Sequence, residues 1–289
     1  MFRDLLVHVD GGQAGRRRVQ FAVALAGRMG ARLSGLHVTP PADVPPLYKP
    51  SRVVEVAAEI SSELALDARE AATTFSEEAT RRLADACWFE AAGDVVEGIS
   101  DKARYADLII LGQYERQGSP ERHPLPIAHS GVLRCGRPVL VVPAVVQPSE
   151  LEKIAVAWDG SREAVRAVHD ALPLLRLSRS VQIVTMIRPS VEDNEVDAKS
   201  LLAHLFNHGI KVGTVLQIRT AEEHESLRKQ IEQGHYDLLV MGGYSHPMWL
   251  EFIFGGATKS ILLSSKIPVL VSHWPNAKRV RLESLCAGH

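Results

Sequence analysis

The sequence predicts an α/β protein made of two tandem, open, five-stranded parallel sheets with helices on both faces. Short apolar runs with turn residues at their ends alternate with longer stretches of helical period, as βαβ units do. This series occurs twice in the same order, and the halves share motifs: Asp10-Gly11 recurs as Asp159-Gly160, and Pro138–Val141 recurs as Pro268–Val271. The chain is therefore read as a duplication.

The first half is predicted to contain five strands and the helices that connect them, beginning at Asp4. Its strands are predicted at Asp4–Val9, Leu33–Val38, Trp88–Ala92, Leu108–Leu111 and Val139–Val142. Its helices are predicted at Arg17–Met29, Val53–Ala86 and Val95–Arg104. The apolar residues of the first helix recur at helical spacing, which places one face against a core.

The second half repeats this order. Its strands are predicted at Ile154–Ala157, Val181–Ile187, Val212–Ile218, Leu238–Met241 and Val269–Val271. Its helices are predicted at Glu163–Leu175, Ala198–Asn207, Glu222–Gln233 and Ala257–Ser265. We expect a first domain at 1–144, a second at 152–274 and a polar, partly basic tail at 275–289, with the linker at Val145–Leu151.

Composition excludes several functional classes. The chain has 289 residues, of which 46% are hydrophobic, with 33 basic and 34 acidic residues and a formal charge of -1. This balance gives no electrostatic basis for nucleic-acid binding. No apolar run long enough for a membrane span and no signal-like N-terminus is found, and the three scattered cysteines suggest neither disulfides nor a zinc site. A cytoplasmic protein with no membrane or nucleic-acid partner is expected.

A glycine-rich stretch is the strongest functional signal. Gly242-Gly243-Tyr244-Ser245 follows a predicted strand, and Gly255-Gly256-Ala257-Thr258 leads into a predicted helix. Glycines let backbone amides approach phosphate oxygens, and a helix N-terminus adds unpaired donors and a favourable dipole. Ser245 and Thr258 add hydroxyl donors. Tight turns alone would explain any single glycine, but four glycines around one loop favour a phosphate site.

Residues after the other strands of the second half are further candidates, because ligands of open parallel sheets bind beyond the carboxyl ends of the strands. Asp159-Gly160-Ser161 follows the first strand, and Ile187 ends the second. Asp159 would accept hydrogen bonds from a ribose or an adenine. An equally good interpretation is that Asp159 and Ser161 cap the helix that follows.

Asp159, the glycine loop and the closing strand Pro268–Val271 together resemble the universal stress protein family in its tandem form, over nearly the whole chain. The family signature is Gly-x2-Gly-x9-Gly followed by Ser or Thr. Gly242 and Gly255 match it, whereas Ser245 replaces the second glycine and Gly256 the hydroxyl residue. The resemblance implies strand order 3-2-1-4-5 in each half, with ATP and Mg²⁺ bound so that adenine lies near Asp159 and Ile187 and the phosphates on the loop.

The first half departs further from this signature. Gly112-Gln113-Tyr114-Glu115 keeps only the first glycine, and Leu125-Pro126 stands where the second half has Gly255-Gly256. A carboxylate at Glu115 repels phosphate, and Pro126 has no N–H to donate. One nucleotide per chain at most is therefore expected, in the second half. The resemblance also implies that the two closing strands pair with each other, giving an intramolecular pseudo-dimer; a further homodimer is left open.

The sequence favours a regulatory protein over an enzyme. It has no GxxxxGK[ST] motif, no Ser/His/Asp arrangement and no paired carboxylates at catalytic spacing. We expect a stress-response protein that binds ATP without using it as a substrate, although slow incidental hydrolysis is left open, and the protein partner is unknown. The alternative is a nucleotide-free interaction module of the same fold. His8 and His37, at matching places on neighbouring strands, are read as core histidines rather than metal ligands.

Overall fold

The computed structural model describes residues 1–44, 48, 50–79, 81–113, 127–146, 151–187, 198–219, 223–243 and 257–274. In the first half the strands are β1 (Asp4–His8), β2 (Arg32–Thr39), β3 (Ala86–Ala92), β4 (Leu108–Gly112) and β5 (Val139–Val142). The helices are α1 (Gly12–Met29), α2 (Val53–Ala79), α3 (Val95–Ala103) and α4 (Ile127–Arg134), and the short 3-10 helix η1 (Pro50–Arg52) precedes α2.

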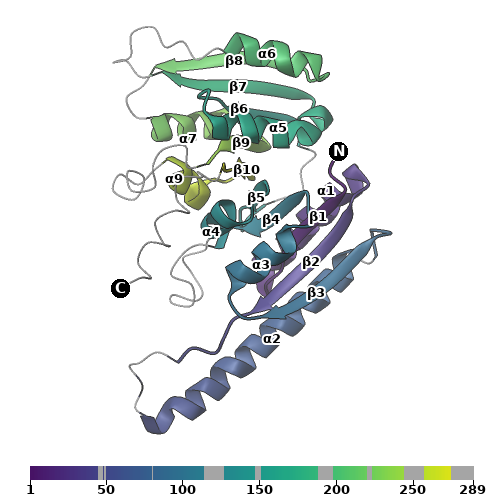
Figure 1. The fold of residues 1–289 in the computed structure, drawn as a ribbon, viewed down its shortest axis with the longest axis vertical. Coiled ribbons are helices and arrows are strands. Elements are labelled where there is room, and N and C mark those ends of the chain that lie inside the picture. Colours follow the sequence, from purple (N-terminus) through teal and green to yellow (C-terminus); the bar gives the residue numbers. More distant parts are fainter. Residues whose placement is uncertain are drawn as a thin grey trace, which may run out of the picture.

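The second half repeats this order of strands and helices (Figure 1). Its strands are β6 (Lys153–Ala157), β7 (Ser180–Ile187), β8 (Val212–Arg219), β9 (Leu238–Gly242) and β10 (Val269–Ser272). Its helices are α5 (Arg162–Leu177), α6 (Ala198–Asn207), α7 (Glu223–Gly234) and α9 (Ala257–Ser264). The fold class predicted from the sequence is thereby confirmed.

The two halves share one continuous ten-stranded sheet. Its order is β3-β2-β1-β4-β5-β10-β9-β6-β7-β8, so each half has the expected order 3-2-1-4-5. Within each half the strands run parallel, whereas β5 and β10 pair antiparallel at the centre, with Leu140 opposite Leu270. The pairing covers two apolar edges that would otherwise expose unpaired backbone groups, and it confirms the expected contact between the closing strands.

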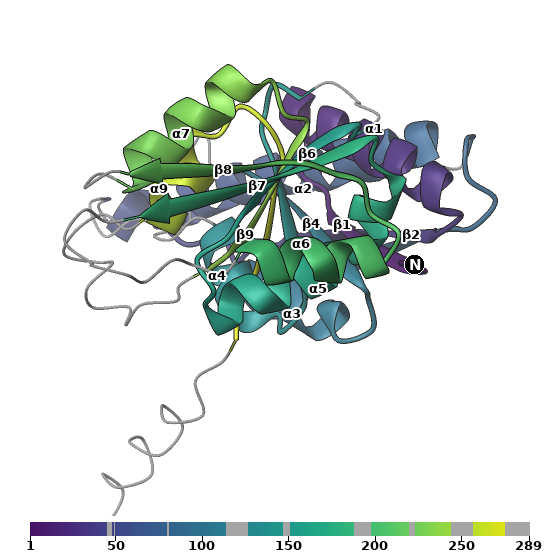
Figure 2. The same cartoon turned by 90° about the horizontal axis from the view of Figure 1, so that it is seen from above.

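Helices cover both faces of the sheet, and each layer runs through both halves. Side chains of α1, α2, α5 and α6 pack in one hydrophobic cluster, and those of α3, α4, α7 and α9 pack in the other. Figure 2 shows the second half of this arrangement, with α7 and α9 on one side of β7 and β8 and with α5 and α6 on the other. Strands buried on both faces read as continuous apolar runs, which is why they were found from the sequence.

Two helix boundaries differ from the prediction by more than two residues, and one helix was not predicted. Helix α1 begins at Gly12 rather than Arg17, and α2 ends at Ala79 rather than Ala86. The alanine-rich end of α2 carries no periodic signal of its own, and Ala86 instead pairs with Leu33 as the start of β3. Helix α4 was not predicted, because it has eight residues and contains Gly131, where a Cβ would lie 2.6 Å from the Leu111 side chain.

Candidate functional site

The candidate site lies where the strand connections diverge. Strand β6 continues to β7 through α5 on one face of the sheet, whereas β9 follows α7 on the other face. The carboxyl ends of the neighbours β6 and β9 therefore border the crevice in which open α/β sheets bind ligands. Asp159, Gly160 and Ser161 follow β6, Ile187 ends the adjacent β7, and Gly242 ends β9.

Gly242 and Gly243 sit where no side chain fits. A Cβ on Gly242 would lie 2.5 Å from the backbone N of Ala164, in the first turn of α5, and a Cβ on Gly243 would lie 2.5 Å from Val271. The Gly243 N–H donates to the Ser272 carbonyl at 2.9 Å, and His273 Nδ1 donates to the Gly243 carbonyl at 3.0 Å. The backbone leaving β9 is thus held directly against α5 and β10, and this close packing within the protein requires glycine at both positions.

Asp159 and Ser161 form a polar turn at the start of α5. One Asp159 carboxylate oxygen accepts from the Ser161 N–H at 2.9 Å and from the Ser161 hydroxyl at 2.6 Å. The Ser161 hydroxyl in turn accepts from the Ala164 N–H at 3.2 Å and caps the helix, and Gly160 supplies the positive φ of 71°. The capping role that the sequence left open is present: Ser161 is the N-cap of α5, and Asp159 binds Ser161.

The loop after β9 re-enters the described residues at α9. Ala257 is the first residue of this helix, and Thr258, in its first turn, is only 4% exposed. Ser245, Gly255 and Gly256 lie outside the described residues. The structure therefore brings together Asp159, Gly160 and Ser161 with Gly242 and Gly243, and places Ile187 at the end of the next strand.

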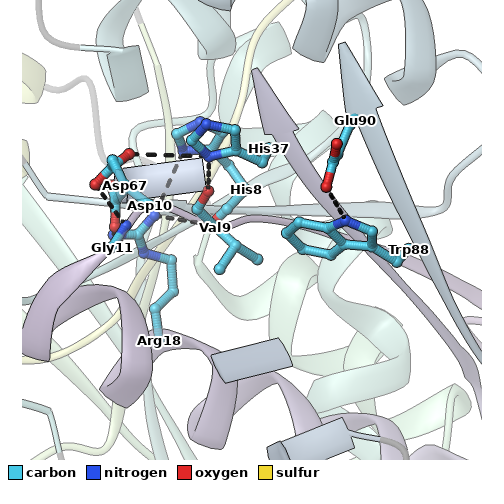
Figure 3. Close-up of polar contacts among 9 residues, drawn as sticks. All are labelled: His8, Val9, Asp10, Gly11, Arg18, His37, Asp67, Trp88 and Glu90. Atoms are coloured by element: carbon cyan, nitrogen blue, oxygen red, sulfur yellow. Dashed lines mark hydrogen bonds and ion pairs between the residues drawn. The ribbon is translucent and has the colours of Figure 1, made fainter. Parts of the chain in front are cut away.

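The first half fills the equivalent crevice with an arginine. Arg18 of α1 is 4% exposed, and its guanidinium donates to both carboxylate oxygens of Asp10 at 2.9 and 3.1 Å and to the His8 carbonyl at 2.8 Å (Figure 3). A Cβ on Gly112 would lie 2.6 Å from the same guanidinium. Arg18 therefore spans from Asp10, in the turn after β1, to Gly112 at the end of β4. Burial alone would raise the pKa of Asp10, but the charges of Arg18 and His8 outweigh it, and that pKa lies below its usual value.

Helix α2 closes the crevice of the first half from a second side (Figure 3). Asp67 accepts the Gly11 N–H at 2.9 Å, and a Cβ on Gly11 would lie 2.5 Å from the same carboxylate oxygen. Burial raises the pKa of Asp67, and the negative charges of Asp10 and Glu70 raise it further, against the lowering effect of the Gly11 hydrogen bond. Negative charge and side chains thus occupy the space next to Asp10.

His8 and His37 are core residues. His37 is 3% exposed and donates from Nδ1 to the Val9 carbonyl at 2.9 Å, while His8 is 5% exposed beside Arg18. Within the described ranges, no group of three or more histidine, cysteine, aspartate or glutamate side chains could hold a metal ion. No helix in these ranges is long and apolar enough to cross a membrane.

Comparison with known proteins identifies the family. The sequence profile of the universal stress protein family matches residues 1–143 and again 150–273. The chain belongs to the universal stress protein family. Searching the curated proteins gave no match.

Solved structures share the fold of this universal stress protein. A universal stress protein from Archaeoglobus fulgidus DSM 4304 is similar with a TM-score of 0.70 at 17% identity, covering 94% of this chain and 97% of that one. A putative universal stress protein from Pseudomonas aeruginosa UCBPP-PA14 gives 0.61 at 14% identity, covering 94% and 93%. The functionally unknown protein PA1789 from Pseudomonas aeruginosa PAO1 gives 0.60 at 14% identity, covering 94% and 92%.

Sequence reasoning missed the residues that close the crevice of the first universal stress domain. Arg18 lies on the same face of α1 as Ala22, Leu25 and Met29, four, seven and eleven residues further on, and all of them are buried. That periodicity was the available signal. Asp67 gave none, because its partner Gly11 is far away in the sequence.

Proposed function

We propose that the second domain, residues 152–274, binds an adenine nucleotide, ATP with Mg²⁺, and that the first domain, 1–144, serves as a nucleotide-free structural partner. The observation that carries this proposal is the contrast between the two crevices. Counted from the matched Asp10-Gly11 and Asp159-Gly160 pairs, Ala167 stands in the second half where Arg18 stands in the first. Ala167 is 1% exposed and carries no charge or length with which to span the crevice.

The roles of the residues follow from their places. Asp159 and Ile187, after neighbouring strands, are assigned to the adenine and ribose, with Gly160 and Ser161 forming the wall at the start of α5. Gly242, Gly243, Ser245, Gly255 and Gly256 are assigned to the phosphates, together with the Ala257 amide and the Thr258 hydroxyl. The fit to a phosphate is supported by the four glycines around the loop, which carry no side chains that would keep phosphate oxygens away from backbone amides.

The proposed role is regulatory rather than catalytic. A nucleotide held by backbone amides and hydroxyl groups lacks the lysine that P-loop enzymes place on the transferred phosphate. The protein would then act in the cytoplasm in a stress response, with occupancy of the second domain as its signal. Turnover of ATP slower than the rate of nucleotide exchange is compatible with this role.

The test compares one charge substitution at matched places in the two halves. Gly255→Glu places a carboxylate in the proposed phosphate loop, and Leu125→Glu does the same at the aligned position of the first half. We expect about one equivalent of nucleotide to be released on denaturing the wild type and the Leu125→Glu variant, and ATP affinity of Gly255→Glu to fall by more than about tenfold through charge repulsion.

Calorimetry with ATP and Mg²⁺ gives the affinities, and chromatography of the released nucleotide gives its identity. Wild-type protein that releases no nucleotide and shows no heat with ATP would favour the interaction module instead. Equal loss of binding in both variants would contradict the assignment to the second domain.

A further inference from the structure

A second hollow lies at the opposite ends of the strands from the proposed nucleotide site. It is a pocket of about 370 Å³ between α7, the start of β9 and the C-terminal part of α9. Tyr236 and Asp237, which precede β9, and Ile267, which precedes β10, belong to its walls. Pockets that hold small molecules are usually of this size or larger.

The floor of this pocket is apolar. It is formed by Ile231 of α7, Leu239 of β9, Ile261 of α9 and the Tyr236 ring, each 8% exposed or less. The Tyr236 ring packs onto Gly234, where a Cβ would overlap it, and its hydroxyl donates to Gln182 on β7. A ligand would therefore meet a preformed apolar surface whose aromatic hydroxyl already has its partner.

The charges around the pocket are paired within the protein. Arg228 contacts Glu225 at 2.7 Å and Glu232 at 3.1 Å, and Lys266 lies 3.6 Å from Glu232. Asp237 accepts the Lys153 N–H at 2.8 Å. A charged ligand would have to compete with these pairs, whereas an uncharged ligand leaves them in place.

His235 gives the pocket one polar side chain in an unusual backbone conformation. It follows α7 with a φ of 48°, a left-handed conformation that residues other than glycine seldom adopt, and it is exposed at the pocket wall. Such backbone strain is often retained at ligand sites. The imidazole offers a hydrogen bond at the rim of the apolar floor, next to charged side chains that are already paired with one another.

The first half provides an internal comparison, in which the corresponding place is bridged. Counted from the matched prolines Pro138 and Pro268, Arg137 stands where the second half has Ile267. Its guanidinium donates to the Arg104 carbonyl just after α3, at 2.9 Å. Ile267 has no group that could make this bridge, so the gap between α7 and α9 is left open.

The geometry points to a second ligand site in this pocket, for a small uncharged molecule with an aromatic or aliphatic body and one hydrogen-bonding group that meets His235. The site is independent of the proposed nucleotide site, because it lies at the amino ends of β9 and β10 rather than beyond their carboxyl ends. At the equivalent place of the first half, Arg137 makes the bridge to the Arg104 carbonyl instead.

The test uses 1-naphthol as the probe and 1-naphthoate as its negatively charged counterpart, with protein labelled on the isoleucine δ-methyl groups. NMR titration of the full chain should show saturable shifts of the Ile231, Ile261 and Ile267 methyls with 1-naphthol, and at least about tenfold weaker binding of 1-naphthoate.

Ile267→Arg, which installs the residue of the first half, should weaken 1-naphthol binding by at least about tenfold, because the arginine side chain fills the gap. Leu263→Arg adds the same charge on α9 at a half-exposed position outside the pocket and should bind 1-naphthol as the wild type does.

His235→Gly removes the imidazole, and glycine adopts the left-handed conformation without strain. This variant should therefore keep the fold and bind 1-naphthol more weakly than the wild type does. The proposal is overturned if the three methyls do not shift, if Ile267→Arg and His235→Gly both bind like the wild type, or if 1-naphthoate binds as tightly as 1-naphthol.

Discussion

Arg18 is a charged residue in the interior, and its surroundings explain why it is tolerated there. Its guanidinium is bound by the two Asp10 oxygens and the His8 carbonyl, while its Nε has no hydrogen-bond partner among the described residues. Burial of a cation costs free energy unless it is paired and hydrogen-bonded. The pair therefore fills the crevice of the first half with charge that the protein itself neutralises.

Replacing this arginine gives a pH-dependent prediction. Arg18→Met should destabilise the protein by about 2 kcal/mol at neutral pH, less than the ~3–5 kcal/mol typical of breaking a fully buried pair, since the Asp10 side chain is 41% exposed. The pKa of Asp10 is lowered in the folded protein, so the stability from the pair is present above the unfolded pKa of about 3.9 and is lost as pH falls through the folded value.

Urea unfolding of wild type and Arg18→Met between about pH 3 and pH 7 checks this expectation. The difference in unfolding free energy should be largest at neutral pH and shrink in acid. Arg104→Met, at an exposed ion pair with Asp101, is the matched control and should change stability little at any pH. A difference that stays constant with pH would rule out the role given to the Asp10 charge.

At the level of elements, the first half supports the helix that leads out of the glycine loop. Gln113, directly after β4, donates from its side-chain amide to the carbonyls of Leu262 and Ser265 at 3.1 Å each. These carbonyls are among those that a helix C-terminus leaves without intrahelical partners. Gly243 stands at the matching place after β9 and has no side chain with which to form the equivalent hydrogen bonds to α4. At these two matched positions, only the first half stabilises a helix end of the other half.

Gln113→Met keeps the size of the side chain and removes both donors. We expect a loss of about 1–2 kcal/mol in stability and faster amide hydrogen exchange in the last turn of α9, with α4 unchanged as the internal control. Mass spectrometry of exchange in peptides from the two helices measures this directly. Exchange in α9 equal to that of the wild type would show that the two hydrogen bonds do not hold the helix end.

The sequence located elements better than it located contacts. Strands such as β1 and β9 are continuous apolar runs because both of their faces are buried. Each strand of one half also has a counterpart in the other half, which supports both assignments. Helix α4 was missed because its eight residues include Gly131, which weakens any helical signal. The contact of Asp67 with Gly11 depends on how α2 returns over the sheet, which no local pattern encodes. The pocket at His235 is recognisable only from the structure, in which Arg137 bridges the place of the first half that Ile267 leaves open in the second.

At the scale of the whole molecule, the two halves are joined by more than a linker. The ten strands form one sheet, and each hydrophobic cluster contains residues of both halves. Val146 and Leu151, in the predicted linker, are themselves buried in one of these clusters. A core shared in this way couples the stability of the halves, because neither can lose its packing without exposing apolar surface of the other.

This coupling predicts that a defect in one half is felt in the other. Ile183→Val on β7 removes one methylene from a fully buried site of the second half and should cost about 1 kcal/mol. Two variants are used, each with a single tryptophan and with phenylalanine at the other three tryptophan positions. The fluorescence of Trp88 reports unfolding of the first half, and that of Trp158 reports unfolding of the second. If the chain unfolds as one unit, Ile183→Val lowers the urea midpoint by the same amount in both backgrounds. If the halves unfold separately, the Trp88 transition does not move, and the shared core contributes nothing to cooperativity between the two halves.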